Sequence, residues 1–193
     1  MRAVLALAVI VLVTGVFGMS QISQAVISKT KLTKTRLVNQ MGSELDYIKT
    51  RIKREEGYKL LPYTLEYETD RGKVVKENFQ TGGYGHQIKK GETHAHFTYT
   101  RDYWERVFEK DFEKAHNGAL KLLGDNINPV AVGIVTEMVY QMGYEGVSKF
   151  EKTLEYIKNE QWELASTEML DSNWAIQTSD RAVELSKVMA NIR

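Results

Sequence analysis

The most apolar stretch of the chain is residues 3–19, which follow a single Arg2. It is longer than the usual core of a signal peptide and slightly shorter than the ~20 residues of a membrane span. Because the stretch is apolar on all sides, it predicts a hydrophobic signal or anchor segment over residues 1–25 rather than a buried core helix. Residues 26–42 are polar and predict a linker or an extra helix, and residues 43–193 predict the folded domain.

The first amphipathic pattern of that domain is a helix ending at Gly57. Leu45, Ile48 and Ile52 recur at helical spacing and form an apolar stripe. The adjacent carboxylates Glu55 and Glu56 fall about equally to either side of this stripe, so periodicity leaves open which one points inward. Negative charge at a helix C-terminus is unfavourable, which indicates either a nearby cation or a function.

Residues 60–86 alternate as strands on either side of a turn near 70–73. A two-residue turn centred on 71–72 would place Glu66 and Thr81 on the same face, and this is the register we favour. A turn longer by one residue would change that face. It would then carry Tyr63, Leu65 and Tyr67.

Helical patterns continue from Thr100 to the end of the chain. Thr100 is a predicted N-cap, and Asp111 lies within an apolar stripe, where a carboxylate needs a partner. His86 is the nearest candidate by type. Asn128 and Pro129 open the next helix, whose largely apolar run ends at Gly143. Further helices are predicted around residues 150–158, 162–170 and 180–192.

Composition excludes several classes of site. The 193 residues contain no cysteine, so neither thiolate nucleophiles nor thiolate metal sites are possible. The net charge is +1, without the basic field typical of nucleic-acid binding. Four histidines are present but show no metal-binding spacing, and we expect no metal and no nucleic-acid partner.

Candidate chemistry concentrates in residues 54–86. Two carboxylates end a helix there, and the motif Thr81-Gly82-Gly83-Tyr84-Gly85-His86 adds a hydroxyl, an imidazole and three glycines. Glycine lets backbone approach a ligand or another chain closely. A carboxylic acid facing such a loop is typical of a hydrolase.

These residues belong to a longer series of motifs, which resembles the phage-type lysozymes, the muramidases related to the T4 lysozyme. The resemblance covers about residues 45–190. It depends on six motifs in order: Arg54-Glu55-Glu56-Gly57; Pro62-Tyr63; Thr81 to His86; Tyr99-Thr100-Arg101-Asp102 through Phe108 and Asp111; Val139 to Gly143; and Asn173-Trp174 with Gln177, Thr178 and Arg181.

The resemblance implies an α+β fold with a small lobe carrying the β-hairpin, a larger all-helical lobe, and a cleft for a glycan strand. It implies that Glu56 is the acid catalyst, that Thr81 assists it, and that Arg181 reaches Glu56. His86 and Asp111 would be a supporting ion pair. Trp174 would pack the helical core, and Gln141 and Thr178 would contact substrate. The implied substrate is peptidoglycan, cut between N-acetylmuramic acid and N-acetylglucosamine without a cofactor.

One motif departs from the family. The usual Tyr-x-Asp is replaced by Tyr63-Thr64-Leu65, and the hairpin is longer by about ten residues, which a surface loop tolerates. An inverting glycosidase needs its two carboxyl groups ~6.5–9.5 Å apart, with a water between them. Glu66, Glu68 and Asp70 are the candidates for the second carboxylate, and the shared face with Thr81 favours Glu66.

The biological setting follows from the resemblance and the N-terminal segment. We expect a monomeric phage endolysin in the host periplasm, tethered to or released from the inner membrane through residues 3–19. The basic residues after that segment oppose export, so its orientation stays open. The alternatives are a lysozyme carried in the virion for entry and a catalytically inactive module that binds peptidoglycan.

Overall fold

The computed structural model describes residues 42–69, 72–89, 91–92 and 99–193. The chain divides into two compact units, Met1–Ser43 and Glu44–Arg193, and the fold below is that of the second unit. The predicted hydrophobic segment and most of the predicted linker lie outside the described residues. No helix within the described ranges is both long and apolar enough to cross a membrane.

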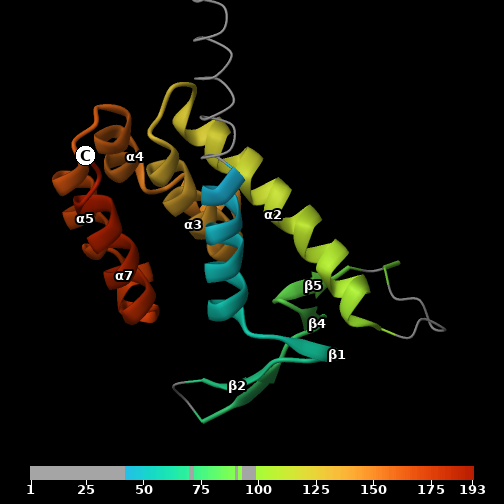
Figure 1. Cartoon of the computed structure of the whole chain (residues 1–193). Helices are drawn as coiled ribbons and strands as arrows, with labels where there is room; N and C mark the ends of the chain where they lie inside the picture. The colour runs from blue at the N-terminus through green and yellow to red at the C-terminus, as the bar shows by residue number, and fades with distance from the viewer. Residues whose placement is uncertain (1–41, 70–71, 90, 93–98) are drawn as a thin grey trace, which may run out of the picture. The chain divides into compact units, whose positions relative to one another are not determined.

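The second unit combines helices with short antiparallel strands, which confirms an α+β fold (Figure 1). It begins with a helix that continues to residue 56. The strands follow, and then the remaining helices. In order they are β1 (Lys59–Tyr63), β2 (Glu66–Glu68), β3 (Val74–Lys76), β4 (Gln80–Gly83), β5 (His86–Ile88), α2 (Arg101–Leu123), α3 (Pro129–Val147), α4 (Glu151–Lys158), α5 (Trp162–Leu170), α6 (Asn173–Gln177) and α7 (Ser179–Ala190).

The strands form two small sheets. One has the order β1-β4-β5 and the other pairs β2 with β3, all antiparallel. The long helix α2 contacts β4 and β5 as well as α3 and α4, so it connects the strands to the helical part of the unit. In Figure 1 the strands accordingly gather around one end of α2.

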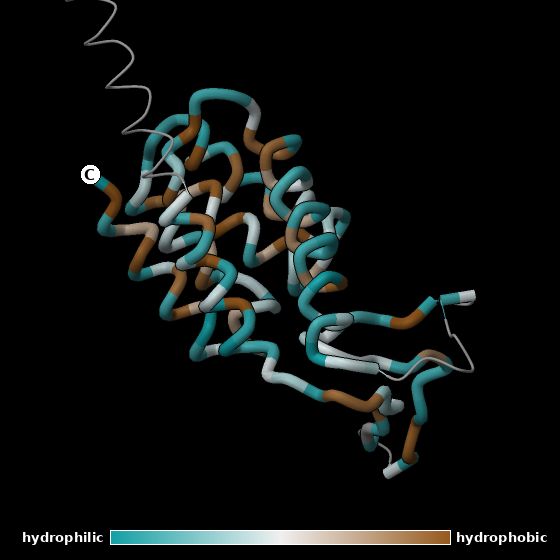
Figure 2. The backbone as a smooth tube through the Cα atoms, turned by 45° about the vertical axis from the view of Figure 1, so that its right-hand side comes forward, coloured by the Kyte–Doolittle hydropathy of each residue, from teal (hydrophilic) through white to brown (hydrophobic). Residues whose placement is uncertain are grey.

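Two hydrophobic clusters stabilise the unit. The larger is built by residues of α2 to α7 and includes Trp174, which confirms the place predicted for that side chain. The smaller lies between the first helix, the strands and α2, where Ile48 and Ile52 pack with Tyr84, Phe108 and Phe112. The stripe predicted for the first helix is therefore its buried face. In Figure 2 hydrophobic and hydrophilic positions alternate along the helices, as amphipathic packing requires.

The hairpin register predicted from the sequence is wrong by one residue. Glu66 lies opposite Lys76 and Glu68 opposite Val74, and the amide of Thr69 donates to the carbonyl of Lys73, so three residues separate the two arms. The turn is longer than predicted because the pairing of side chains along both strands sets the register, and the register in turn sets the turn length. Asn78 and Phe79 then form a bend that leads into β4.

The helix boundaries largely follow their predicted signals. The Thr100 side chain accepts from the amide of Tyr103, and the Asn128 side chain accepts from that of Val130, with Pro129 at the first position. Gly143 has φ 74° and ψ 166° and interrupts α3, but helical backbone resumes and continues to Val147. The short α6 was not predicted. It begins where the Ser172 hydroxyl accepts from the amide of Ala175.

Candidate functional site

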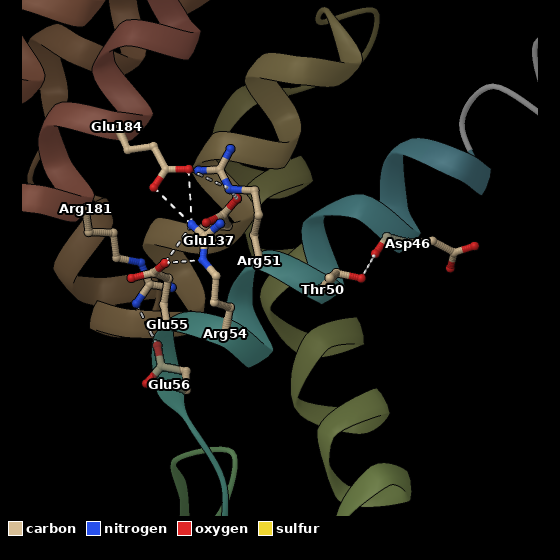
Figure 3. Close-up of polar contacts among 9 residues, drawn as sticks. All are labelled: Asp46, Thr50, Arg51, Arg54, Glu55, Glu56, Glu137, Arg181 and Glu184. Atoms are coloured by element: carbon tan, nitrogen blue, oxygen red, sulfur yellow. Dashed lines mark hydrogen bonds and ion pairs between the residues drawn. The ribbon is translucent and has the colours of Figure 1, made fainter.

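The first helix ends in two carboxylates, Glu55 and Glu56, which have different partners in the structure. Glu56 Oε1 accepts a hydrogen bond of 2.7 Å from Arg181 Nη1, and the Glu56 side chain is 22% exposed (Figure 3). Glu55 instead binds its neighbour Arg54, also at 2.7 Å. Glu56 is therefore the carboxylate engaged by another element, and the expected contact with Arg181 is present.

Arg181 comes from the first turn of α7 and is buried, with its side chain only 8% exposed. Its guanidinium supplies the positive charge that the end of the first helix lacks, because the last carbonyl groups and Glu56 are both negative there. The pair joins residues 125 positions apart in sequence. Tertiary packing thus holds the orientation of the Glu56 carboxylate.

The glycines of the Thr81–His86 motif serve two purposes. Gly82 and Gly83 lie under the ring of Trp104, where an added Cβ would come within 2.5 and 2.6 Å of ring atoms. Gly85, with φ 83°, lies beside Glu56, and a Cβ there would be 3.2 Å from Glu56 Oε2. The expected close approach is made to a tryptophan and to the candidate acid.

Thr81 lies on β4, which the turn at Tyr84 and Gly85 connects to β5. It is buried and pairs with Tyr63 of β1. No hydrogen bond of its hydroxyl is found among the described residues, and the pairing of β1 with β4 is irregular between Lys59 and Tyr63. The hydroxyl is therefore available to a water or a substrate.

His86 and Asp111 form the expected pair. His86 Nδ1 is 2.6 Å from Asp111 Oδ2, and Nε2 is 3.3 Å from Glu92 Oε2. The hydrogen bond with Asp111 raises the pKa of His86, against the lowering effect of burial. This pair connects the strand following the glycine turn to α2.

Glu66 does not share a face with Thr81. Its carboxylate binds Lys76 Nζ at 2.7 Å across the separate β2–β3 sheet and is 53% exposed. The predicted shared face depended on the shorter turn, so the observed register removes the reason for choosing Glu66. Glu68 lies on the same exposed ribbon, and Asp70 lies outside the described residues.

The two predicted substrate contacts both bind Trp174. Gln141 Oε1 accepts from the indole Nε1 at 2.8 Å, and the Thr178 hydroxyl donates to the carbonyl of Trp174 at 2.9 Å. Both side chains stay partly exposed. These hydrogen bonds place the side chains of Gln141 and Thr178 beside Trp174, where α3 and α6 meet.

Glu137 of α3 is a buried acid beside the site that the sequence analysis did not single out. Glu137 is 1% exposed, and its Oε1 lies 3.2 Å from Nε of Arg51, which is also buried. Burial raises the pKa of Glu137 to about 7, while Arg51 and Arg181 lower it. A charged residue in the middle of an apolar run was the available signal.

Within the described residues, no cluster of acidic or histidine side chains could hold a metal ion.

Comparison with known proteins gives two informative relatives, while no family model matches the chain. The chain is 35% identical over 83 residues to "Probable T4-type lysozyme 2" of Dictyostelium discoideum, which covers 40% of this chain and 49% of that protein. It is 29% identical over 110 residues to "Probable T4-type lysozyme 1" of the same organism, covering 54% of this chain and 64% of that protein. The chain thus matches between about half and two thirds of the length of these relatives.

Proposed function

We propose that this chain, which is similar to two probable T4-type lysozymes, is a glycoside hydrolase of bacterial peptidoglycan. Its substrate is the β-1,4 bond between N-acetylmuramic acid and N-acetylglucosamine, and it uses no cofactor. The observation that carries this proposal is the Glu56 carboxylate, held by buried Arg181 on one oxygen and approached by Gly85 at the other.

Glu56 is the general acid of the proposed reaction. Cleavage requires a proton on the leaving glycosidic oxygen while positive charge develops on the sugar ring. Glu56 donates that proton, so the bond from the anomeric carbon to the leaving oxygen breaks and the oxygen departs as a hydroxyl. The partial burial of Glu56 and its fixed orientation keep the donor aligned with the bond.

The Thr81 hydroxyl orients the attacking water. Water adds its oxygen to the anomeric carbon and releases one proton to solvent, and the Glu56 carboxylate takes up one proton from solvent, which restores the acid. The free hydroxyl of Thr81 supports this role, and the exposed, Lys76-bound carboxylate of Glu66 does not support one for Glu66. Gln141 and Thr178 contact the glycan from the side of Trp174.

Clearing of chloroform-treated Gram-negative cells tests the proposal directly. The wild-type chain should clear a turbid suspension, and Glu56→Gln should abolish clearing because it removes the transferable proton while keeping the shape. Glu55→Gln is the matched control and should stay active, since the ion pair of Glu55 is with its neighbour Arg54 and not with Arg181. A wild type that clears no cells identifies the inactive wall-binding module, and equal clearing by wild type and Glu56→Gln excludes Glu56 as the acid.

The proposed biological role is that of a phage endolysin acting in the host periplasm, with residues 3–19 meeting the inner membrane. The apolar character of that segment supports this role over that of a virion lysozyme. Detection of the protein in purified virions would favour the entry role instead. Its absence from virions, with lysis delayed in a phage lacking the gene, would support the endolysin.

A further inference from the structure

The helix α3 buries a carboxylate that the proposed reaction does not use. Glu137 is 1% exposed, and its Oε1 is 3.2 Å from Arg51 Nε. Its other oxygen, Oε2, is buried without a hydrogen-bond partner in the described part of the chain. A buried carboxylate with an unpaired oxygen is costly, because the surroundings replace only part of its hydration.

The two arginines that act on Glu137 also have buried nitrogens without hydrogen-bond partners among the described residues. Arg51 Nε makes no well-directed hydrogen bond despite its short distance to Glu137, and its second acidic neighbour, Glu184, is 3.8 Å away. Arg181 binds Glu56 through Nη1, but its Nε and Nη2 are buried and lack partners among the described residues. Figure 3 shows these side chains converging from the first helix, α3 and α7.

A purely structural role does not account for this arrangement. Apolar residues of similar volume usually replace a buried ion cluster at no loss of stability. The buried residues that precede Glu137 in α3 are apolar from Ala131 to Val135, and the buried Thr136 is uncharged, so Glu137 is the buried charge of this helix. The charge of Glu137 therefore calls for a role in the neighbouring pair of Arg181 and Glu56.

We propose that Glu137 is a positioning residue. Its negative charge attracts the guanidinium of Arg181 and so weakens the interaction of Arg181 with the Glu56 carboxylate. The inference rests on the proposed function, because it concerns the protonated form of Glu56 that a general acid needs. Charges interact strongly in this buried cluster, where water screens them little. With Glu137 neutral, Arg181 binds Glu56 alone and favours its ionised form, which cannot donate a proton.

The groups that face Glu137 give the effect a pH dependence. Arg51 and Arg181 favour its charged form, whereas burial and the carboxylates of Glu184 and Glu55 favour its neutral form. The resulting pKa of about 7 means that Glu137 is mostly neutral at pH 5.5 and mostly charged at pH 8.5. Glu137 therefore supports the acid on the alkaline side of neutrality.

Cell-wall clearing measured from pH 5.5 to 8.5 tests this effect with Glu137→Gln. At pH 5.5 the variant should match the wild type within about twofold, because Glu137 is already uncharged there. At pH 8.5 it should be about tenfold slower, the factor that corresponds to one pH unit of coupling. An equal loss at both pH values, or no loss at pH 8.5, overturns the proposal.

A matched control and a second variant keep this test clear. Glu184→Gln removes one carboxylate charge from the same cluster at a position that is 42% exposed. Because Glu184 favours the neutral form of Glu137, this variant keeps Glu137 charged at pH 8.5 and should clear cells there like the wild type. If Glu137→Gln does not fold, Glu137→Met supplies the same neutral state with an apolar side chain. Thermal unfolding of each variant separates lost activity from lost structure.

A measurement independent of turnover completes the test. Coupling between two sites is reciprocal, so the charge of Glu56 must also act on Glu137. Carbon-13 NMR titration of the Glu137 carboxyl in Glu56→Gln should give a midpoint lower by at least about half a pH unit than in the wild type, because Arg181 is then free to compensate Glu137. An unchanged midpoint overturns the inference, whereas a shifted midpoint together with a wild-type chain that clears no cells overturns only the proposed function.

Discussion

Gly85 lies against the carboxylate of Glu56, so close that a Cβ at this position would be 3.2 Å from Glu56 Oε2. The backbone there has φ 83°, which L-residues with a side chain rarely adopt. The turn between β4 and β5 and the end of the first helix therefore constrain each other's position. This contact connects the glycine motif to the candidate acid.

Substitution Gly85→Ala should lower cell clearing by about tenfold, because the added methyl group displaces the Glu56 carboxylate and misplacement of a reacting group is costly. Gly91→Ala is the matched control, since Gly91 also has positive φ (95°) but has no atom within 4 Å of an added Cβ. Both variants should lose similar stability in urea unfolding. Equal activity of the two would show that Gly85 has no effect on Glu56 beyond backbone strain.

Substitution Gly83→Ala should destabilise the chain by roughly 2 kcal/mol or more, because it combines a left-handed backbone with overpacking against a buried ring. The added Cβ would be 2.6 Å from the ring of Trp104, whose indole donates to the carbonyl of Leu60. Gly72→Ala has a similar φ of 72° but only an ordinary contact at 3.5 Å, so it should cost about 1 kcal/mol. Denaturant unfolding of both measures the difference, and equal losses would contradict a packing role for Gly83.

The pair of His86 and Asp111 should stabilise the fold most at acidic pH. The folded-state pKa of His86 is raised by Asp111, so the contribution is fully present below the unfolded value near 6.5 and disappears as pH rises through the folded value. Asp111→Asn should therefore lower the free energy of unfolding more at pH 5.5 than at pH 9. Asp102→Asn, which removes a carboxylate in the first turn of α2, should show no such dependence because it leaves the pair of His86 and Asp111 intact.

Substitution Glu66→Gln should keep cell clearing within about twofold of the wild type and change stability little, since exposed ion pairs contribute roughly 0–1 kcal/mol. Glu66 is 53% exposed and binds Lys76 on a sheet separate from Thr81. Lys76→Met serves as the control for loss of the ion pair. If Glu66→Gln abolished clearing while Lys76→Met did not, Glu66 would be the second carboxylate after all.

The sequence by itself determined the elements whose signals are local. The spacing of Leu45, Ile48 and Ile52 predicted a helix with one buried face, because helical period and burial are coupled over a few residues. Thr100 and Asn128 predicted helix starts, because a cap satisfies amide groups only two or three residues away. The series of motifs indicated a resemblance to the T4-type lysozymes, which the two relatives support.

Only the tertiary structure decided which groups meet. Glu55 and Glu56 were equivalent on the helical wheel until Arg181, 125 residues away, bound one of them. The hairpin register, and with it the position of Glu66, followed from pairing along whole strands and not from the turn residues. The cluster of Arg51, Glu137 and Arg181 brings together three elements, and the energy of a buried charge depends on surroundings that no local pattern encodes.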